Sequence, residues 1–448
     1  MQTSPTNQAT AELPLKIGLA TLGCKVNQYE SAAIAEDLRK NNCLLVPFNA
    51  QADVYIINTC TVTALSDFQS RQLIHRAHRN NPQAKILVTG CYAQISPGDI
   101  AKLAGVSLVV GNGMKNKIAA LLRSKQDVRS ANYTVDPAEQ KSFCYMPVTR
   151  FGRRTRPFLK IQDGCNSSCS YCIVPAVRGS SRSLPPPELL QALTNLIREG
   201  YKEIVFTGIH LGCYGHDLEP ACDLTRLLGQ LAGRCGEARI RLSSLEPREI
   251  TAALLHTLHN SDFLCPHLHI PLQSGDDDIL RLMRRNYDTR FYRLLIEQIY
   301  SAVSDVAIGT DVMVGFPSET DAQFENTLQL LEDLPVTYLH VFPYSERPGT
   351  AAQKIQPKIP EVVKKERAAA LRHLSIRKQE NFALRFLGKP LKVLVEDVKD
   401  KKTGMWKGFS QNYLPFLLDE TFTSSVNKIV TLRPEKYHAG KLYGKISS

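Results

Sequence analysis

The chain has 448 residues, enough for two or three domains that each bury a core of their own. Hydrophobic residues make up 43% of it and charged residues 22%, which is ordinary for a globular protein and excludes wholesale disorder. No apolar run approaches the roughly 20 residues that cross a bilayer. The first dozen residues lack the basic start and apolar centre of a signal peptide. We therefore expect a cytoplasmic protein with no membrane partner.

Cysteine content and charge narrow the class of protein further. The cytosol keeps thiols reduced, so twelve cysteines indicate metal or redox chemistry more than disulfides. The net charge is +12, and residues 361–448 hold 18 Lys or Arg against 9 Asp or Glu. Such a concentration of positive charge favours a polyanionic partner, with nucleic acid first. The alternative is a solvated basic surface without a partner.

The first segment, residues 14–140, alternates short apolar runs with helical patterns. The pattern predicts three strands and two intervening helices, with strands at 15–20, 53–58 and 85–90 and helices at 31–40 and 66–79. Strands separated by helices form βα units, so we expect an α/β domain with an open parallel sheet.

Three cysteines of this segment share one position relative to the strands. Cys24, Cys60 and Cys91 each follow the carboxyl end of a predicted strand. In a parallel sheet these ends lie at one edge, where α/β domains bind ligands. We therefore expect the three thiols to converge and to form a metal site. The alternative is three unrelated buried cysteines, which are common in protein cores.

The second segment, residues 150–385, follows a linker at 151–157. Six strands separated by helical patterns are predicted, at 157–161, 203–208, 238–244, 266–272, 307–315 and 337–343. Repeated βα units build parallel barrels, and six units in place of eight predict an open, partial (βα)6 barrel.

A C-x3-C-x2-C run, made of Cys165, Cys169 and Cys172, follows the first of these strands. Thiolates are the ligands that iron–sulfur clusters prefer, and three of them leave one iron of a [4Fe–4S] cluster free to bind a small molecule. The run also lies at the face where parallel barrels place their chemistry. It therefore indicates a catalytic cluster.

The third segment, residues 386–448, has no helical period. Five short strands are predicted, at 391–398, 404–409, 413–420, 427–434 and 441–446. They predict a small antiparallel β-barrel, a fold that binds RNA through basic and aromatic side chains.

The cysteine run, with "KIQDG" before it and "YCIVPAVRG" after it, resembles the radical S-adenosylmethionine (SAM) enzymes. Together with "TLGCKVNQYES", "INTCTVT" and "VTGCYAQ", it makes roughly residues 15–448 similar to the methylthiotransferases. That resemblance implies a cysteine-bearing α/β domain, a radical SAM barrel and a carboxyl-terminal TRAM domain. "LGCKVNQYES" and "LKIQDGCN" resemble the branch that converts N6-threonylcarbamoyladenosine (t6A) at position 37 of tRNA, beside the anticodon, to its 2-methylthio derivative.

The resemblance also implies the cofactors and partners. Cys165, Cys169 and Cys172 would hold a [4Fe–4S] cluster that binds SAM and yields the 5′-deoxyadenosyl radical. A second [4Fe–4S] cluster on Cys24, Cys60 and Cys91 would carry or supply the sulfur, and a second SAM the methyl group. The implied partners are the anticodon stem-loop of tRNA and an electron donor such as a flavodoxin or ferredoxin system.

Several barrel residues are candidates for cofactor binding. They lie at predicted strand ends and are Thr207, Gly208, Arg241, Ser243, Glu246, His269, Gln273 and Ser274. We expect Thr207 and Gly208 near the methionine amino group, Arg241, Ser243 and Glu246 near the carboxylate or ribose, and the backbone of 311–317 near the adenine. The alternative interpretation of Gly208 is a tight turn without a cofactor contact. The alternative for His269 is a core histidine whose hydrogen bonds are satisfied within the protein.

The remaining cysteines match no pattern, although Cys213 follows a strand that would face the site. Ser318 occupies a place where the family often has glycine.

Three other functions stay open on sequence alone. The same architecture serves methylthiolation of isopentenyladenosine in tRNA and of an aspartate in a ribosomal protein. A non-catalytic iron–sulfur protein that senses or binds RNA is the third. No physical argument from the sequence separates the nucleobase substituents, and the oligomeric state is open as well.

Overall fold

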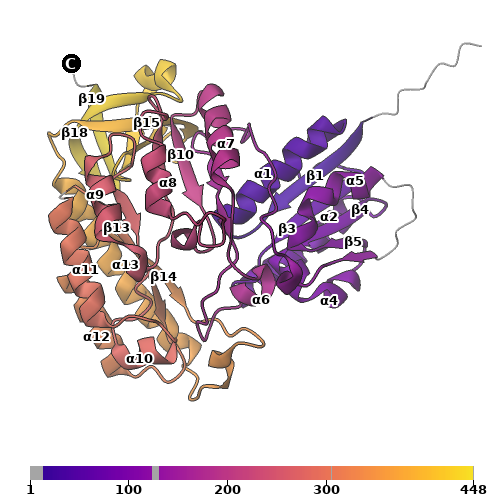
Figure 1. Ribbon diagram of the computed structural model, residues 1–448, viewed down its shortest axis with the longest axis horizontal. Helices are drawn as coiled ribbons and strands as arrows, with labels where there is room; N and C mark the ends of the chain where they lie inside the picture. Colours follow the sequence, from indigo (N-terminus) through magenta and orange to yellow (C-terminus); the bar gives the residue numbers. More distant parts are fainter. Residues whose placement is uncertain (1–13, 124–130, 304, 447–448) are drawn as a thin grey trace, which may run out of the picture.

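The computed structural model describes residues 14–123, 131–303 and 305–446. The N-terminal domain lies to one side of a larger βα domain, and a small β-barrel lies at one end of the latter (Figure 1). Residues 1–12, the polar stretch considered above, lie outside the described residues. Among those that are described, no helix combines the length and the apolar character needed to cross a membrane.

The N-terminal domain is built on a parallel sheet with the strand order β2-β1-β3-β4-β5-β6. Its strands are β1 (Leu15–Thr21), β2 (Cys43–Val46), β3 (Val54–Thr59), β4 (Lys85–Gly90), β5 (Val106–Val110) and β6 (Ala131–Tyr133). Its helices are α1 (Lys25–Lys40), α2 (Ala64–Asn80), α3 (Cys91–Ile95), α4 (Pro97–Ala101) and α5 (Ile118–Arg123). The open parallel sheet is confirmed, with β1, β3 and β4 as the predicted strands and three further strands beside them.

Helix α1 begins directly after Cys24, six residues before the predicted start. Its first turns carry polar residues that a helix normally exposes, yet Asn27 and Glu30 are buried. They face partners on the larger domain, described below, so tertiary contacts account for the early start.

The larger domain contains all six predicted strands in parallel. They are β7 (Phe158–Lys160), β10 (Glu203–Thr207), β11 (Arg239–Leu242), β12 (His267–His269), β13 (Ala307–Val314) and β14 (Tyr338–Pro343). Two three-stranded sheets, β11-β10-β7 and β12-β13-β14, are linked by the bridges Ile240–Leu264 and Ser244–His269. The partial (βα)6 barrel is thereby confirmed, with β7 and β14 as its edges.

Helices cover the outside of this barrel and bury an apolar stripe against it. They are α7 (Pro186–Arg198), α8 (Leu224–Gln230), α9 (Ala252–Asn260), α10 (Asp277–Leu282), α11 (Thr289–Ala302), α12 (Asp321–Asp333) and α13 (Glu361–Leu384). In α7, for example, Leu189, Leu193 and Leu196 are buried. A short helix, α6 (Val174–Arg178), follows the cysteine run, and a two-strand ribbon, β8 (Gln162–Asp163) and β9 (Arg182–Ser183), flanks it.

The C-terminal domain is a closed barrel with the order β15-β16-β17-β19-β18. Its strands are β15 (Leu391–Lys399), β16 (Trp406–Ser410), β17 (Pro415–Leu418), β18 (Ile429–His438) and β19 (Lys441–Ile446). The barrel is not wholly antiparallel as predicted, because β17 and β19 pair in parallel and so close it. Phe382 and Phe386, at the end of α13, pack in its core.

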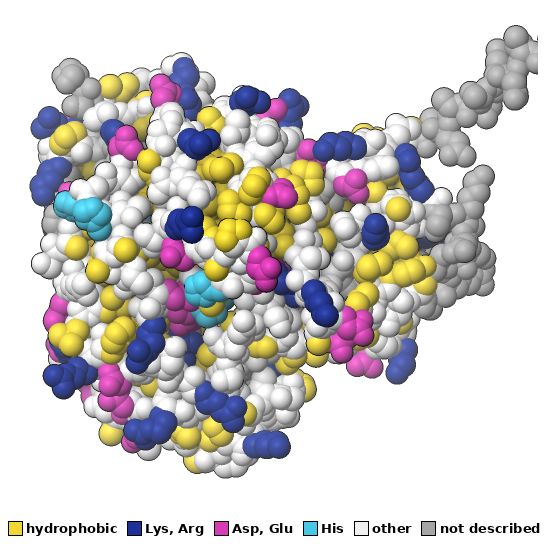
Figure 2. Space-filling view, viewed as in Figure 1, with side chains coloured by type: hydrophobic (Ala, Val, Ile, Leu, Met, Phe, Trp, Pro, Cys, Tyr) yellow, Lys and Arg dark blue, Asp and Glu magenta, His cyan; other side chains and the backbone are white. Residues whose placement is uncertain are grey.

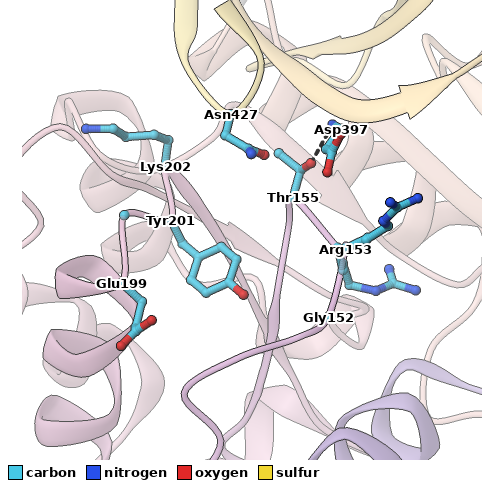
Figure 3. A pocket seen from close by; sticks show the side chains of 10 residues that line it. Gly152, Arg153, Thr155, Glu199, Tyr201, Lys202, Asp397 and Asn427 are labelled. Atoms are coloured by element: carbon cyan, nitrogen blue, oxygen red, sulfur yellow. Dashed lines mark hydrogen bonds between the residues drawn. The ribbon is translucent and has the colours of Figure 1, made fainter. Parts of the chain in front are cut away.

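The linker before β7 attaches this small barrel to the larger domain. The backbone N–H of Asp397 donates to Thr155 Oγ1 over 2.8 Å. A cavity of about 190 Å³ lies at this seam, with Arg153, Lys202 and Asn427 among its lining residues (Figure 3). None of the described residues that line the cavity is a cysteine, so we assign it to the attachment of the domains and not to the chemistry.

Candidate cluster and cofactor site

The three N-terminal cysteines lie at the carboxyl ends of neighbouring strands. Cys24 follows β1, Cys60 follows β3 and Cys91 follows β4, and these strands are adjacent in the sheet. The thiols lie close together, since the charge of Cys91 acts to raise the pKa of Cys24, and the charges of Cys91 and Cys24 act to raise that of Cys60. Gly23, with φ of +94°, makes the turn, and a Cβ there would come within 2.9 Å of Cys60 Sγ.

Burial raises the pKa of the Cys24 thiol, and raises that of Cys60 to about 11. Cys24 nevertheless keeps solvent-accessible surface. Both observations fit a thiol on the floor of a recess, surrounded by protein but reachable from outside. Thiols with raised pKa values stay protonated at neutral pH until a metal displaces the proton.

The cysteines of the C-x3-C-x2-C run also converge. Burial, followed by the charges of Cys169 and Cys165, raises the pKa of Cys172 to about 12. The backbone N–H of Cys172 donates to the carbonyl of Cys169 over 3.2 Å, so the run closes on itself. Burial acts to raise the pKa of Cys165 as well, but hydrogen bonds from His210 and Ser167 lower it.

Hydrogen-bond donors surround the sulfurs of this second trio. His210 Nδ1 lies 3.3 Å from Cys165 Sγ, and Arg285 NH1 donates to Cys169 Sγ over 3.2 Å. Arg285 also pairs with Glu246, which fixes its guanidinium. Donors on ligand sulfurs tune the potential of iron–sulfur clusters. His210 and Arg285 were not predicted from the sequence, and Glu246 was expected to contact the cofactor.

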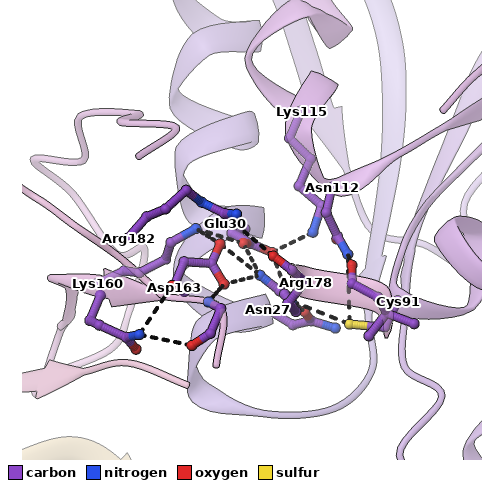
Figure 4. A network of polar contacts seen from close by, with 12 residues as sticks. Asn27, Glu30, Cys91, Asn112, Lys115, Lys160, Asp163, Arg178 and Arg182 are labelled. Carbon is purple, nitrogen blue, oxygen red and sulfur yellow. Dashed lines mark hydrogen bonds and ion pairs between the residues drawn. The ribbon is translucent and has the colours of Figure 1, made fainter. Parts of the chain in front are cut away.

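A buried polar network joins the two domains beside Cys91 (Figure 4). Glu30 from α1 pairs with Lys160 Nζ at 2.9 Å and with Arg178 NH1 at 2.6 Å. Asp163 pairs with the same two cations, and Lys115 also pairs with Glu30. We call these five residues the Arg178 network. Three cations face two carboxylates, so the network carries one excess positive charge.

This excess charge lies next to the N-terminal trio. Arg178 Nε donates to Cys91 Sγ over 3.4 Å, and NH2 donates to Asn27 Oδ1 over 2.6 Å. Cys91 also packs against Ile173 and Val177, and Ile173 directly follows Cys172. An apolar contact therefore connects the two cysteine trios, which face each other across the interface between the two domains.

The residues present fit iron–sulfur clusters and a polar cofactor. Each trio supplies three thiols, which are suitable iron ligands, with donors aimed at the sulfurs. Past the ends of β11 and β12, Ser243 Oγ and Gln273 Oε1 are buried and make no hydrogen bond within the described residues. Gln273 also has a φ of +68°, a conformation that is costly for a non-glycine residue. Both belong to the predicted set, and their cofactor contacts stay a prediction.

The other predicted cofactor residues make contacts within the protein. The Thr207 carbonyl accepts from the backbone N–H of Ile161 over 2.9 Å. A Cβ at Gly208 would come 2.8 Å from Gln162 Oε1, so close packing alone requires glycine there. Ser274 is buried against Thr327.

Arg241 lies elsewhere than the sequence analysis expected. It pairs with Glu203 Oε1 at 2.7 Å, and its NH1 and NH2 donate to the carbonyls of Gln411 and Ser410. Its donors thus join the barrel to the C-terminal domain, at the opposite end from the cysteine run. Arg241 pairs with Val205 of β10, so it lies within the sheet and not beyond the carboxyl end of β11.

Two further side-chain groups were not foreseen. Cys213 lies with His210 and Glu249, their potential ligand atoms within 4.8 Å of one another, which places Cys213 beside the cysteine run. His269 forms a second such group with Asp311 and His340. The sequence pattern offered His269 as a cofactor candidate and the backbone of 311–317 as a lining of the adenine, but it gave no sign of His340.

Two family models match the chain and indicate its class. The model of the "Radical SAM superfamily" matches residues 159–331, and that of the "Uncharacterized protein family UPF0004" matches residues 16–111. The radical SAM methyltransferase TsrM from Kitasatospora setae, solved with cobalamin and a [4Fe-4S] cluster, shares the fold with a TM-score of 0.57. It is 13% identical in sequence, and the match covers 76% of this chain and 77% of TsrM.

Curated relatives then define the family. The threonylcarbamoyladenosine tRNA methylthiotransferase MtaB of Bacillus subtilis is 38% identical, with 93% of both chains covered. That of Aquifex aeolicus is 39% identical over 85% of this chain and 93% of its own. The tRNA-2-methylthio-N(6)-dimethylallyladenosine synthase of Clostridium botulinum is 30% identical over 95% of this chain and 96% of its own. The chain belongs to the radical SAM methylthiotransferases, in the branch of the threonylcarbamoyladenosine enzymes.

Proposed function

We propose that the protein is a radical SAM enzyme that adds a methylthio group to t6A at position 37 of tRNA, giving 2-methylthio-t6A. The observation that carries the proposal is the presentation of two three-cysteine groups to each other across one interface, at Cys91 and Ile173. Relatives named for this activity, 38% and 39% identical over most of the chain, support the substrate.

In this proposal Cys165, Cys169 and Cys172 hold the [4Fe–4S] cluster that binds SAM, and Cys24, Cys60 and Cys91 hold the auxiliary [4Fe–4S] cluster. When bound, these groups supply the radical, the sulfur and the methyl group. The protein orients the sulfurs through His210, Arg285 and Arg178, and it excludes water from the contact between the trios.

The tRNA anticodon stem-loop is the proposed macromolecular partner. The excess of Lys and Arg in residues 361–448, most of them in the small C-terminal barrel, provides electrostatic attraction to its phosphates. We further infer a flavodoxin or ferredoxin system as the electron donor, and action in the cytoplasm. The proposed domain limits are 14–140, 150–385 and 386–448.

The test is a reaction with anaerobically reconstituted protein, SAM, a reductant and tRNA that carries t6A. Mass spectrometry of the digested nucleosides should detect 2-methylthio-t6A together with released 5′-deoxyadenosine. Conversion of isopentenyladenosine in place of t6A would refute the substrate. Absence of 5′-deoxyadenosine from iron-loaded protein would favour the non-catalytic RNA-binding reading.

A further inference from the structure

One face of helix α2 carries a continuous row of exposed side chains. The members of the row are spaced three or four residues apart, so they lie on the same side of the helix. They are Leu65, Phe68, Gln72, Arg76 and Arg79, and all five are exposed. At a rise of 1.5 Å per residue the row is about 21 Å long. We call these five residues the α2 row.

The N-terminal end of the α2 row is apolar although it faces solvent. Leu65 is 62% exposed and Phe68 is 51% exposed, and Val62, in the loop before the helix, is 53% exposed. A single exposed apolar residue is ordinary on a protein surface. Three of them within seven positions, each more than half exposed, indicate a surface that binds a partner.

This apolar end lies beside the N-terminal cysteine trio. Val62 follows Cys60 by two positions, and Ser70 Oγ donates to the carbonyl of Cys60 over 3.5 Å. The backbone N–H of Ala64 donates to Ser345 Oγ of the larger domain over 3.0 Å. The start of α2 is therefore fixed both to the trio and to the larger domain.

The other end of the α2 row is cationic. Asp67 is the only acidic residue of α2 (Ala64–Asn80), and its carboxylate pairs with Arg347 of the larger domain at 2.5 Å. Arg76 and Arg79 make no ion pair within the part of the chain that the structure describes. Lys and Arg side chains lie on the surface of both large domains (Figure 2), so positive charge alone does not mark a site. The distinguishing feature here is that two unpaired arginines continue a row whose other end is apolar and adjoins the trio.

On the basis of the proposed function, we propose that the α2 row binds the anticodon stem-loop of tRNA. Leu65 and Phe68 pack against unpaired bases of the loop, and Arg76 and Arg79 bind phosphates of its backbone. Aromatic side chains beside a cationic surface bind single-stranded nucleic acid in this way, by stacking and by charge. The α2 row thereby extends tRNA recognition from the C-terminal barrel to the N-terminal domain.

The position of the apolar end favours RNA over a protein partner. The base that receives sulfur has to reach the trio, so the nucleotides next to it pass the surface beside Cys60. The alternative partner is the protein that donates electrons, because an acidic protein would also be attracted to Arg76 and Arg79. Such a donor would have no unstacked bases to pack on Leu65 and Phe68.

Binding of a synthetic stem-loop that carries t6A to the reconstituted full chain, measured at several salt concentrations, tests this proposal. Arg76→Gln/Arg79→Gln should bind about tenfold more weakly, and the slope of log affinity against log salt should fall by about 1.5, because two phosphate contacts are lost. Phe68→Ala should also bind about tenfold more weakly but keep the wild-type slope, because stacking releases no counterions.

Matched controls lie on outer helices of the larger domain. Arg226→Gln/Arg234→Gln removes the same charge from two exposed arginines, one on α8 and one in the turn after it. Leu294→Ala truncates an apolar side chain that is 56% exposed on α11. Both controls should bind the stem-loop as the wild type does. Iron content and the unfolding midpoint in urea report whether each variant is folded.

Wild-type affinity and salt slope in both folded α2 variants would overturn the proposal. Slower reduction of the clusters by a flavodoxin, with unchanged stem-loop binding, would overturn it too and would assign the α2 row to the electron donor. The proposed function is tested separately. Failure of the wild type to convert t6A would refute that function, whereas conversion of t6A together with stem-loop binding that the variants do not change would refute the α2 row alone.

Discussion

Arg178 Nε donates to Cys91 Sγ over 3.4 Å, so a cation of the barrel domain touches a cysteine of the N-terminal domain. Burial acts to lower the pKa of Arg178, but Cys91, Glu30 and Asp163 raise it well above its ordinary value. Arg178 is therefore charged at every accessible pH. It holds the two domains together and places positive charge beside a sulfur that we propose as an iron ligand.

Replacing Arg178 by methionine should destabilise the fold and the auxiliary cluster together. Truncating one partner of a buried ion pair costs about 3 kcal/mol or more, since Glu30 loses donors. We expect a lower unfolding midpoint in urea and a changed reduction potential of the cluster on Cys24, Cys60 and Cys91. The matched control is Arg281→Met, at an exposed i,i+3 pair. An unchanged potential in folded Arg178→Met would refute the electrostatic role.

The two trios should fail in different ways. Cys169→Ala should abolish release of 5′-deoxyadenosine, because the variant leaves the cluster with two of its three thiol ligands. Cys60→Ala should leave release measurable and stop formation of the methylthio product. Both products are measured by mass spectrometry. Equal loss of both in Cys60→Ala, with the barrel cluster intact, would contradict this division of labour.

Glu203 should make the joint to the C-terminal barrel sensitive to acid. Burial acts to raise its pKa, but Arg241 and Arg239 hold that pKa far below the ordinary 4.5. The carboxylate therefore contributes stability that is fully present above about pH 4.5 and is lost as the pH falls below it. Urea unfolding at pH 7 and at acidic pH should show this loss.

The variant Glu203→Gln isolates the contribution of this carboxylate. It should cost about 3 kcal/mol at pH 7 and flatten the acid dependence. An equally steep acid dependence in Glu203→Gln would show that other carboxylates are responsible.

Ser318→Gly should stabilise the protein by about 1 kcal/mol. Ser318 has a φ of +69°, in the left-handed region where a Cβ is strained and glycine is not. The expected gain is a higher thermal midpoint, with Ser318→Ala as the control that should give none. A lower midpoint for the glycine variant would mean that the Ser318 side chain contributes more than its backbone costs.

Local sequence patterns predicted the parts of the site that depend on strand ends. Cys24, Cys60 and Cys91 could be grouped because parallel strands end at one edge, and β1, β3 and β4 are in fact neighbours. The six barrel strands followed in the same way from βα alternation. Strands β2, β5 and β6 were missed, since they are short and two of them lie at the sheet edges.

Long-range pairing could not be predicted. Glu30 and Arg178 are separated by 148 positions, so no spacing in the sequence relates them. Arg241 was assigned to the cofactor because it stands near a strand end, but its donors contact Glu203 and the carbonyls of Gln411 and Ser410. His340 escaped notice because its partners, Asp311 and His269, come from two other strands.

Iron analysis of the anaerobically reconstituted chain, with Mössbauer spectra, tests the central claim most directly. Two clusters on two cysteine trios predict about eight irons per polypeptide in the wild type, all in [4Fe–4S] form. The same assignment predicts about four irons per polypeptide in Cys60→Ala and about four in Cys169→Ala. About four irons in the wild type, lost entirely in one variant and untouched in the other, would contradict the claim.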